Sequence, residues 1–315
     1  MADLKLINMR DVEVESIRWL WYPFIPYGKV TIIQGDPGEG KTTLVLQIIA
    51  RLTKGESIID EKEKPPINVI YQTAEDGLAD TIKPRLLAAN ADCSKVLVID
   101  DRDTPLTMRD VRLEQAIVET NAKLVVLDPI QGFLGADVDM HRANEIRPIM
   151  KHIAELAEKY KCAIILIGHM NKCSVGKSAY RGLGSIDFQA AARSVLIVGR
   201  IKDEPEVRVV CQTKSSLAPE AKAVAFRLSE ENGFEWIGEL DITADDLLSG
   251  TVKGTKKQTA MDFLEKLLAD GQMAQTEIIE LARQKGISDK TLRNAKDELK
   301  IKSKRVNNQW HWSFD

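Results

Sequence analysis

This sequence has few of the features that mark secreted, zinc-bound or membrane proteins. Its four cysteines (Cys93, Cys162, Cys173 and Cys211) are scattered, with no C-x-x-C pair. A disulfide framework and a zinc site are therefore not expected, and a reducing cytoplasm fits. No apolar run reaches the roughly 18 residues that a membrane-spanning helix needs, and the start, MADLKLINMRD, lacks the apolar core of a signal peptide. We expect a cytoplasmic protein without a membrane partner.

The composition is that of a globular protein, but its charge is unevenly spread. Hydrophobic residues make up 44% of the 315 residues and charged residues 29%, enough for a large domain and a small one. The net charge is −3. Residues 256–315 carry 12 Lys and Arg against 9 Asp and Glu, a net of +3, so the remaining residues carry −6. A basic tail on an acidic body suggests a polyanionic partner for the tail.

Residues 35–44, GDPGEGKTTL, match the phosphate-loop pattern G-x-x-x-x-G-K-[ST]. The β-rich run KVTIIQG precedes them, and a periodic apolar run follows and ends at Gly55, a helix stop. A strand, a glycine loop and a helix place backbone N–H groups around a β-phosphate. Lys41 would reach the β- and γ-phosphates, and the Thr42 hydroxyl would ligate Mg²⁺. The predicted nucleotide-binding residues are Gly35, Asp36, Pro37, Gly38, Glu39, Gly40, Lys41, Thr42 and Thr43.

Short apolar runs after this loop alternate with helical stretches, which predicts an α/β fold. The runs are INVIYQT (67–73), KVLVID (95–100), KLVVLD (123–128), AIILIGH (163–169), SVLIVGR (194–200), EVRVVCQTK (206–214) and AVAFRLS (223–229). The early runs are continuously apolar, as in parallel strands buried on both faces, and the later ones alternate, which suggests an antiparallel extension. Apolar residues at helical spacing over 145–160 predict a helix. We place the sheet domain at 1–240 and a polar linker at 241–257.

The tail, 258–315, predicts a winged helix-turn-helix domain. Two short amphipathic helices each end at a glycine, a third begins at Ser288 as N-cap, and IKSKRVNNQWHWSF alternates like a hairpin about Asn307–Asn308. Between 288 and 305 there are seven basic and three acidic residues, which is typical of a recognition helix. A solvated face of a protein-binding module is the alternative. The DNA-binding candidates are Lys290, Arg293, Lys296, Lys304 and Arg305.

Besides the Thr42 hydroxyl, an acidic group at the end of a buried strand is expected to hold Mg²⁺ through water. Asp128, ending LVVLD, is preferred over Asp100, which opens the cluster DDRD. Pro129 follows Asp128, so no glutamate stands beside the metal aspartate to activate water. The general base is then expected elsewhere, and Glu75 in VIYQTAED is the candidate. An acid favoured by a helix dipole is the alternative interpretation of Glu75.

One further motif bears on whether the nucleotide base is guanine. HMNKCS contains Asn171–Lys172 of a guanine-reading N-K-x-D motif, but position 174 is serine, so the carboxylate that grips guanine is missing. We therefore exclude a GTPase. A kinase of small metabolites would leave the long sheet and the basic tail unexplained.

Five runs in order, GDPGEGKTTL, VIYQTAEDGLADTIKPRLLAA, LVVLDPIQGFLG, AIILIGHMNK and RGLGSIDFQAAARSVLIV, resemble the RepA-like branch of the RecA/DnaB-type P-loop ATPases. The resemblance covers roughly residues 18–230. It implies a RecA core that assembles into a ring, usually a hexamer, with ATP at each subunit interface. It also implies that Glu75 activates water, that Asp128 orients the metal and that His169 senses the γ-phosphate. As a lone residue His169 could equally be a core histidine.

The resemblance further implies contacts to a neighbouring subunit and to DNA. Lys214 matches the place of a basic finger that enters the neighbour's active site, with Arg208 and Arg200 as weaker candidates. A solvated lysine at a strand end is the alternative. Loops 135–144 and 171–182 match the pore-facing DNA loops, of which the first is acidic. The second carries the phosphate-binding candidates Lys172, Lys177 and Arg181.

Three functions follow as alternatives. The preferred one is an ATP- and Mg²⁺-dependent motor or helicase-like protein of mobile-element or phage replication. It would form a homo-oligomer, expected to be a hexamer, with single-stranded DNA through the ring and duplex DNA on the tail. The second is an ATP-regulated, DNA-binding regulator or loader that does not translocate, and the third is a recombinase-like filament ATPase.

Overall fold

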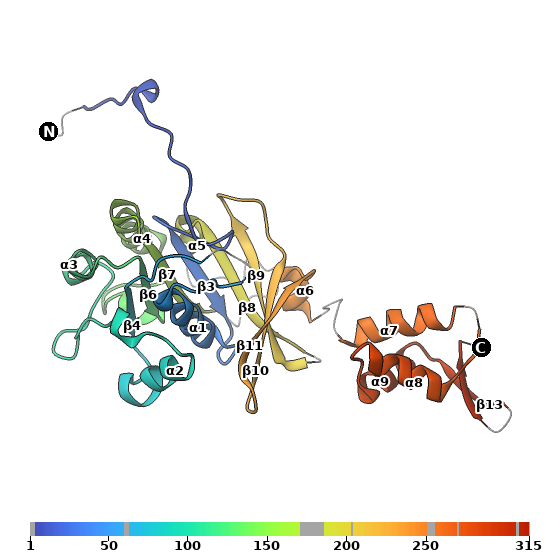
Figure 1. Ribbon diagram of the computed structural model, residues 1–315. Coiled ribbons are helices and arrows are strands. Elements are labelled where there is room, and N and C mark those ends of the chain that lie inside the picture. The colour runs from blue at the N-terminus through green and yellow to red at the C-terminus, as the bar shows by residue number, and fades with distance from the viewer. Residues whose placement is uncertain are drawn as a thin grey trace. The chain divides into compact units, whose positions relative to one another are not determined.

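The protein is described by a computed structural model that covers residues 4–59, 63–170, 186–202, 204–250, 256–269, 271–306 and 309–314. One nine-stranded sheet has the order β11-β10-β9-β8-β3-β7-β6-β4-β5 (Figure 1). By their internal contacts the residues form two compact units. One contains residues 1–198 and 212–221, and the other contains residues 199–211 and 222–315.

Six strands form the parallel part of the sheet. They are β3 (Val30–Gly35), β4 (Val69–Thr73), β5 (Val96–Leu97), β6 (Leu124–Asp128), β7 (Ala163–His169) and β8 (Ser194–Ile201). The pairings β3–β7, β3–β8, β4–β5, β4–β6 and β6–β7 are all parallel. Strands β3 and β6 are buried at every position. The prediction that continuously apolar runs form parallel strands buried on both faces is confirmed.

The strand predicted over 95–100 is wrong beyond Leu97, because a side chain takes the place of the strand partner there. The Gln72 amide on β4 donates to Ile99 O and accepts from Ile99 N, each at 3.0 Å. These two bonds satisfy the backbone of Ile99 without a ladder, so the chain leaves the sheet before Asp100.

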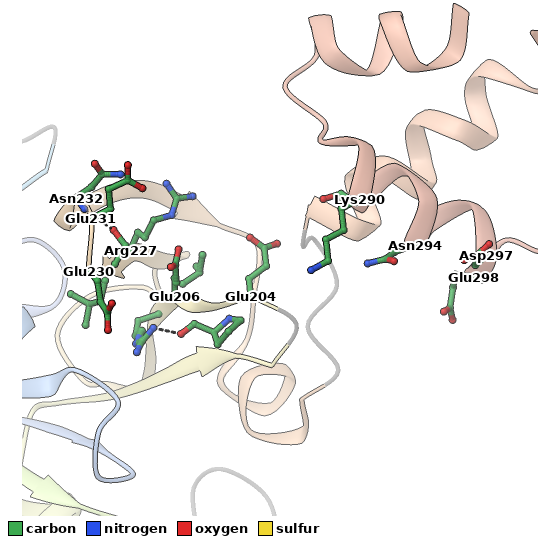
Figure 2. A pocket seen from close by; sticks show the side chains of 16 residues that line it. Glu204, Glu206, Arg227, Glu230, Glu231, Asn232, Lys290, Asn294, Asp297 and Glu298 are labelled. Carbon is green, nitrogen blue, oxygen red and sulfur yellow. Dashed lines mark hydrogen bonds between the residues drawn. The ribbon is translucent and has the colours of Figure 1, made fainter. Parts of the chain in front are cut away.

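An antiparallel meander extends the sheet, as the alternating runs predicted. It consists of β9 (Glu204–Ser215), β10 (Ala223–Ser229) and β11 (Gly233–Leu240). Strand β11 was not predicted from the sequence, and its residues alternate between exposed and half-buried. Figure 2 shows acidic side chains near the ends of these strands, among them Glu204, Glu206, Glu230 and Glu231.

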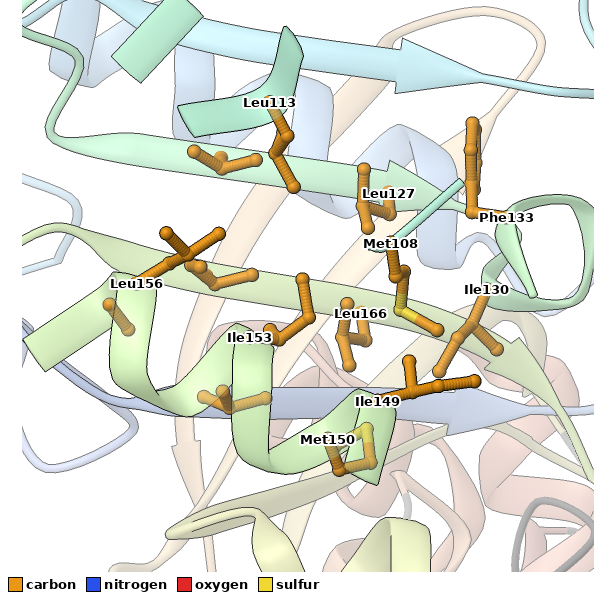
Figure 3. Close-up of a cluster of buried hydrophobic side chains, with 14 of the residues drawn as sticks. Met108, Leu113, Leu127, Ile130, Phe133, Ile149, Met150, Ile153, Leu156 and Leu166 are labelled. Carbon is orange, nitrogen blue, oxygen red and sulfur yellow. The ribbon is translucent and has the colours of Figure 1, made fainter. Parts of the chain in front are cut away.

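Helices cover both faces of the parallel strands (Figure 1). Helices α1 (Lys41–Lys54) and α2 (Lys83–Ala88) lie on one face, and α3 (Val111–Thr120), α4 (Ala143–Tyr160) and α5 (Ile186–Ala191) lie on the other. Ile149, Ile153 and Leu156 of α4 pack in one buried cluster with Leu127 and Leu166 of the sheet (Figure 3). The helix predicted over 145–160 is therefore confirmed, with its apolar side facing the sheet.

Short elements complete this part of the chain. They are η1 (Met9–Asp11), β1 (Trp19–Trp21), β2 (Ile25–Pro26), the π-helical turn η2 (Leu78–Ile82), η3 (Cys93–Lys95) and η4 (Ile130–Phe133). Helix α6 (Ala244–Ser249) lies within the segment expected as linker and begins with a capping box between Thr243 and Asp246. Leu247 of this helix is buried. The domain boundaries stay a prediction.

The tail contains three helices and a small antiparallel sheet. These are α7 (Lys256–Leu267), β12 (Met273–Ala274), α8 (Gln275–Gln284), α9 (Asp289–Glu298), β13 (Lys302–Val306) and β14 (Gln309–Ser313), with strand order β12-β14-β13. Ser288 caps α9, as predicted, by accepting from Thr291 N. β13 pairs with β14, and the predicted turn at 307–308 lies outside the described residues. Ten buried residues from Ala260 to Trp312 form the core of the tail.

In the described part of the chain no helix has both the length and the apolar character needed to cross a membrane.

Candidate nucleotide-binding site

The phosphate loop connects the carboxyl end of β3 to the first turn of α1. Gly38 and Gly40 have φ values of +80° and +88°, a left-handed conformation that glycine adopts without a steric penalty. Gly40 is the N-cap of α1 and provides no side-chain acceptor, so the first N–H groups of the helix have no capping side chain. At Gly35 a Cβ would lie 2.2 Å from Val198 O on β8. The loop thus combines backbone donors, a helix dipole and close strand packing, which suits an anion.

Lys41 is held inside this loop and is only 5% exposed. Its Nζ donates to Gly35 O and Asp36 O, both at 2.8 Å, and lies 3.4 Å from His169 Nδ1. Burial lowers the pKa of Lys41, while Asp128, first among the nearby carboxylates, opposes this change. Because the carbonyl acceptors are neutral, they leave the positive charge available for phosphate oxygens.

A hydroxyl and a carboxylate meet beside the start of α1. Thr42 Oγ1 donates to Asp128 Oδ2 at 2.7 Å, and Tyr71 OH donates to the same oxygen at 2.9 Å. Burial raises the pKa of Asp128, and the two hydrogen bonds lower it in part. The pKa of Tyr71 is also raised, first by burial and then by the Asp128 charge, so the phenol remains a donor.

Tyr71 was not among the site residues predicted from the sequence. Its only signal was a hydroxyl-bearing residue inside the apolar run VIYQT. A buried phenol generally needs a partner for its hydroxyl, but only the tertiary structure shows that the partner is Asp128.

These oxygen ligands fit a magnesium ion. Mg²⁺ prefers hydroxyl, carboxylate and water oxygens, keeps several waters, and rarely takes more than one or two carboxylates. Thr42 Oγ1 and Asp128 Oδ2 lie beside the phosphate loop and so meet this requirement. Asp100, the rival metal ligand, is instead held by Arg102 at 2.5 Å, and this bond lowers the pKa of Asp100 to about 2.

Glu75 lies just past the end of β4, near the site but exposed. Its side chain is 64% exposed, and Oε2 lies 4.0 Å from His169 Nε2. His169 is the last residue of β7. Its Nδ1 faces Lys41 and its Nε2 faces Glu75. Asp76, the neighbour of Glu75, instead forms an ion pair with Arg85 at 3.4 Å. The structure therefore brings Lys41, His169 and Glu75 into one row.

Lys214 lies on β9, and its side chain reaches the end of helix α5. Its Nζ donates to Gln189 O at 2.7 Å and to Ala190 O at 3.0 Å, two carbonyls near the end of α5. Burial lowers the pKa of Lys214. Of the weaker finger candidates, Arg208 bonds to Pro205 O and Arg200 is exposed. Lys214 thus caps α5 of its own chain, and its predicted role toward a neighbour stays a prediction.

The predicted DNA contacts are only partly within the described residues. In the loop 135–144, Arg142 pairs with Asp139 and Glu145 at 3.3 and 3.4 Å, so its cation is neutralised locally. The loop 171–182, with its three basic candidates, lies outside the described residues.

On the tail, four of the five predicted DNA contacts are exposed and one is half-buried. Lys290 and Arg293 lie on α9, and Lys304 and Arg305 lie on β13. The half-buried Lys296 places its Nζ over the Trp312 ring, 5.2 Å from the centroid. Figure 2 shows Lys290 and Asn294 on the first part of α9, with Asp297 and Glu298 at its end. The two exposed cations of α9 thus lie in the first half of the helix, and acidic residues follow at its end.

A P-loop nucleotide-binding domain of the RecA-like kind is the class of protein that this sheet and this site define. Residues 3–175 match the profile of a family described as AAA domain. Because the match spans more than half of the chain, the protein belongs to this family.

Known proteins resemble parts of the chain. DNA repair protein RadA of Halalkalibacterium halodurans is 29% identical over 148 residues, 46% of this chain and 28% of that protein. Protein RecA of Sinorhizobium medicae is 25% identical over 232 residues, 69% of this chain and 61% of that protein. The chain thus spans only about a quarter to three fifths of these relatives.

Two solved structures share the fold. A KaiC-like protein from Pyrococcus horikoshii OT3 aligns with a TM-score of 0.51 at 16% identity, over 70% of this chain and 99% of that one. The ATPase domain of G40P aligns with a TM-score of 0.50 at 13% identity, over 67% of this chain and 85% of that one.

Proposed function

We propose that this protein hydrolyses ATP with Mg²⁺ and uses the energy as a ring-forming motor on single-stranded DNA. The observation that carries the ATPase part is the 2.7 Å bond between Thr42 Oγ1 and Asp128 Oδ2, formed beside the phosphate loop. A hydrogen bond with a purely structural role would need neither the glycine loop nor a buried lysine beside it. Phosphoryl transfer needs the threonine–aspartate pair, the glycine loop and the lysine in one place.

Each residue of the site has a role in this proposal. The backbone N–H groups of residues 38–43 cradle the phosphates, and Lys41 moves from its carbonyl acceptors to the β- and γ-phosphate oxygens. Thr42 would ligate Mg²⁺ directly, and Asp128 would hold it through water. When bound, the ion neutralises phosphate charge. Tyr71 keeps the Asp128 carboxylate turned toward Thr42.

Glu75 is the proposed general base for the attacking water. Its 64% exposure leaves room for water between its carboxylate and a bound nucleotide, and His169, 4.0 Å away, can report the γ-phosphate to the loop that follows β7. Catalytic hydrogen bonds are often long in the absence of substrate, so the distance does not weigh against this role.

The DNA part of the proposal rests on the relatives and on the tail. RadA, which resembles part of this chain, is described as a DNA repair protein. The helix–strand–helix–helix–strand–strand order of residues 256–313 is that expected of a winged helix-turn-helix domain. Exposed cations on α9 and β13 suit duplex phosphates. We propose an ATPase domain at 1–240, a linker at 241–257 and the winged domain at 258–315.

Assembly completes the proposal. We propose a homo-oligomer, expected to be a hexamer, in which the basic loop 171–182 faces the strand and Lys214 leaves α5 to enter the neighbour's site. In that case Lys214 bonds to Gln189 O and Ala190 O in the single chain, and these bonds break on assembly.

ATP hydrolysis and strand separation test this proposal together. The wild-type protein should hydrolyse ATP, more rapidly with single-stranded DNA, and should displace a labelled strand from a forked duplex. Lys41→Ala should abolish both, whereas Lys83→Ala on the exposed start of α2 should abolish neither. DNA-stimulated hydrolysis without displacement would favour a regulator or loader, and no hydrolysis would reject the whole proposal. Electron microscopy with a non-hydrolysable ATP analogue separates closed rings from filaments.

A further inference from the structure

A cavity of about 530 Å³ lies at the amino ends of the parallel strands. Its lining comes from the turns that precede these strands: Tyr27 before β3, residues 64–68 before β4, Lys95 before β5, Lys123 before β6 and Lys161 before β7. The phosphate loop follows the carboxyl end of β3, so this cavity lies at the opposite edge of the sheet. The proposed nucleotide site does not use it.

The cavity is strongly basic. Five of its twelve lining residues are cationic and none is acidic. The cations are Arg18, Lys64, Lys95, Lys123 and Lys161. Lys161 forms an ion pair with Glu15 at 2.8 Å, but both side chains are more than half exposed, so water and salt screen this pair. Like charges gathered from five separate segments repel one another and cost stability, unless an anion offsets them.

Neutral oxygens accept hydrogen bonds from two of these ammonium groups. Lys64 Nζ donates to the backbone oxygens of Trp19 and Leu20 at 3.1 and 2.7 Å. Lys123 Nζ donates to Asn121 Oδ1 at 2.7 Å. The amide acceptor fixes the position of the Lys123 ammonium group without cancelling its charge, which prepares it for an anionic ligand.

Two aromatic rings add a flat surface beside the cations. Trp19 and Tyr27 both line the cavity and are half-buried, and the Arg18 guanidinium lies 5.7 Å from the Tyr27 ring centroid. Ring faces next to cations are what nucleic-acid bases and their phosphates need together. A volume of this size also suits a ligand as large as a nucleotide.

We propose that this cavity binds the phosphate of a nucleotide unit, at a site separate from the phosphate loop. The unit is either a free nucleotide or one nucleotide of a single strand, since both present a phosphate next to a base. The site goes beyond the proposed motor function and does not depend on ATP hydrolysis.

The test uses the full chain with Lys41→Ala in every protein compared, so that the phosphate loop contributes less to binding. One probe is a fluorescent dT20 strand followed by anisotropy, and the other is pyrophosphate followed by calorimetry. Lys95→Glu combined with Lys123→Glu should weaken phosphate binding by about tenfold or more at low salt. For dT20, the slope of log affinity against log salt concentration should fall in magnitude by about 1.4, which is twice the ~0.7 expected per cation on single strands. Lys83→Glu combined with Lys151→Glu makes the same charge change on exposed helix surfaces and should have little effect.

The two probes distinguish the source of the phosphate. A loss for dT20 alone indicates a strand, and a loss for both probes, with ADP competing, indicates a free nucleotide. The proposal is overturned if neither probe binds the Lys41→Ala protein, if both bind equally well after the double substitution, or if the control pair weakens them as much. Absence of ATP hydrolysis in the wild type would reject the motor and leave the pyrophosphate result intact.

Discussion

Asp128 accepts two hydrogen bonds on one carboxylate oxygen and is almost fully buried. Burial disfavours the negative charge of this carboxylate. The pKa of Asp128 is raised, chiefly by burial. The folded protein therefore binds this proton more tightly than the unfolded chain does. Between the unfolded and the folded pKa, stability falls as pH rises, and at neutral pH the ionised carboxylate lowers the free energy of unfolding.

Asp128→Asn tests this trade between stability and function. The amide oxygen can still accept from Thr42 and Tyr71, while the buried charge is gone. We expect a higher Tm for the nucleotide-free protein at neutral pH, a difference that shrinks in acid, and a loss of about 10- to 100-fold in Mg²⁺ affinity, as for a second-shell ligand. Calorimetry across pH and Mg²⁺ titration of ATP binding measure both. A lower Tm with unchanged Mg²⁺ dependence would contradict the assignment.

Glu75→Gln tests the water-activating role. A positioned general base contributes about 10²–10⁴-fold in rate, so we expect kcat to fall by about 100-fold while Mg²⁺–ATP affinity is kept and the protein accumulates in the ATP-bound assembled state. Asp76→Asn and Asp100→Asn serve as controls, because Arg85 and Arg102 already pair with these acids. Hydrolysis by the Glu75 variant within a few-fold of wild type would move the role to one of them.

At the scale of elements, the site depends on how closely β3 and β8 approach. β3 pairs with β8 over Thr31–Gln34, and the next residue, Gly35, packs against the Val198 carbonyl. This contact sets where the phosphate loop leaves the sheet, because any side chain at Gly35 would have to move the backbone of β8.

Gly35→Ala should therefore weaken nucleotide binding and lower the Tm. A Cβ placed 2.2 Å from a backbone oxygen cannot be relieved by a side-chain rotation, so β3 and the loop must shift. Gly233→Ala at the first residue of β11 is the control, since a Cβ there meets nothing within 4 Å. Its φ of +68° should cost only about 1–2 kcal/mol of backbone strain. Equal ATP affinity in the two variants would show that the β3–β8 contact does not position the loop.

At the scale of the whole molecule, Lys214 distinguishes a finger from a helix cap. If it acts in a neighbouring site, Lys214→Ala should lose hydrolysis but keep nucleotide binding. Mixing it with Lys41→Ala protein should restore part of the activity, because one kind of mixed interface then has an intact loop and an intact finger. A cap of α5 acts within its own chain and allows no such rescue. Hydrolysis is measured over a range of mixing ratios, with co-assembly confirmed by light scattering.

The tail provides the second whole-molecule prediction. Among the described residues, the tail has a buried core cluster of its own, from Ala260 to Trp312. Truncation near residue 255 should leave basal ATP hydrolysis largely intact and weaken binding to duplex DNA. Arg293→Ala with Lys304→Ala should weaken duplex binding in the full chain by reducing the positive charge. Duplex binding as tight as that of the whole chain would reject the docking role.

The sequence by itself determined the elements that depend on local spacing. The phosphate loop, the Gly55 end of α1, the Ser288 cap of α9 and the apolar side of α4 could all be predicted. In each case a backbone conformation or a periodic pattern is encoded within a few neighbouring residues.

Only the tertiary structure decided which distant residues meet. The Gln72 amide ends β5 early, Tyr71 joins Thr42 at Asp128, and Lys214 caps α5, and none of these contacts has a signature in local spacing. The basic cavity at the amino ends of the strands is the same kind of feature. Its five cations are far apart in the sequence and are gathered because parallel strands begin at one edge of a sheet.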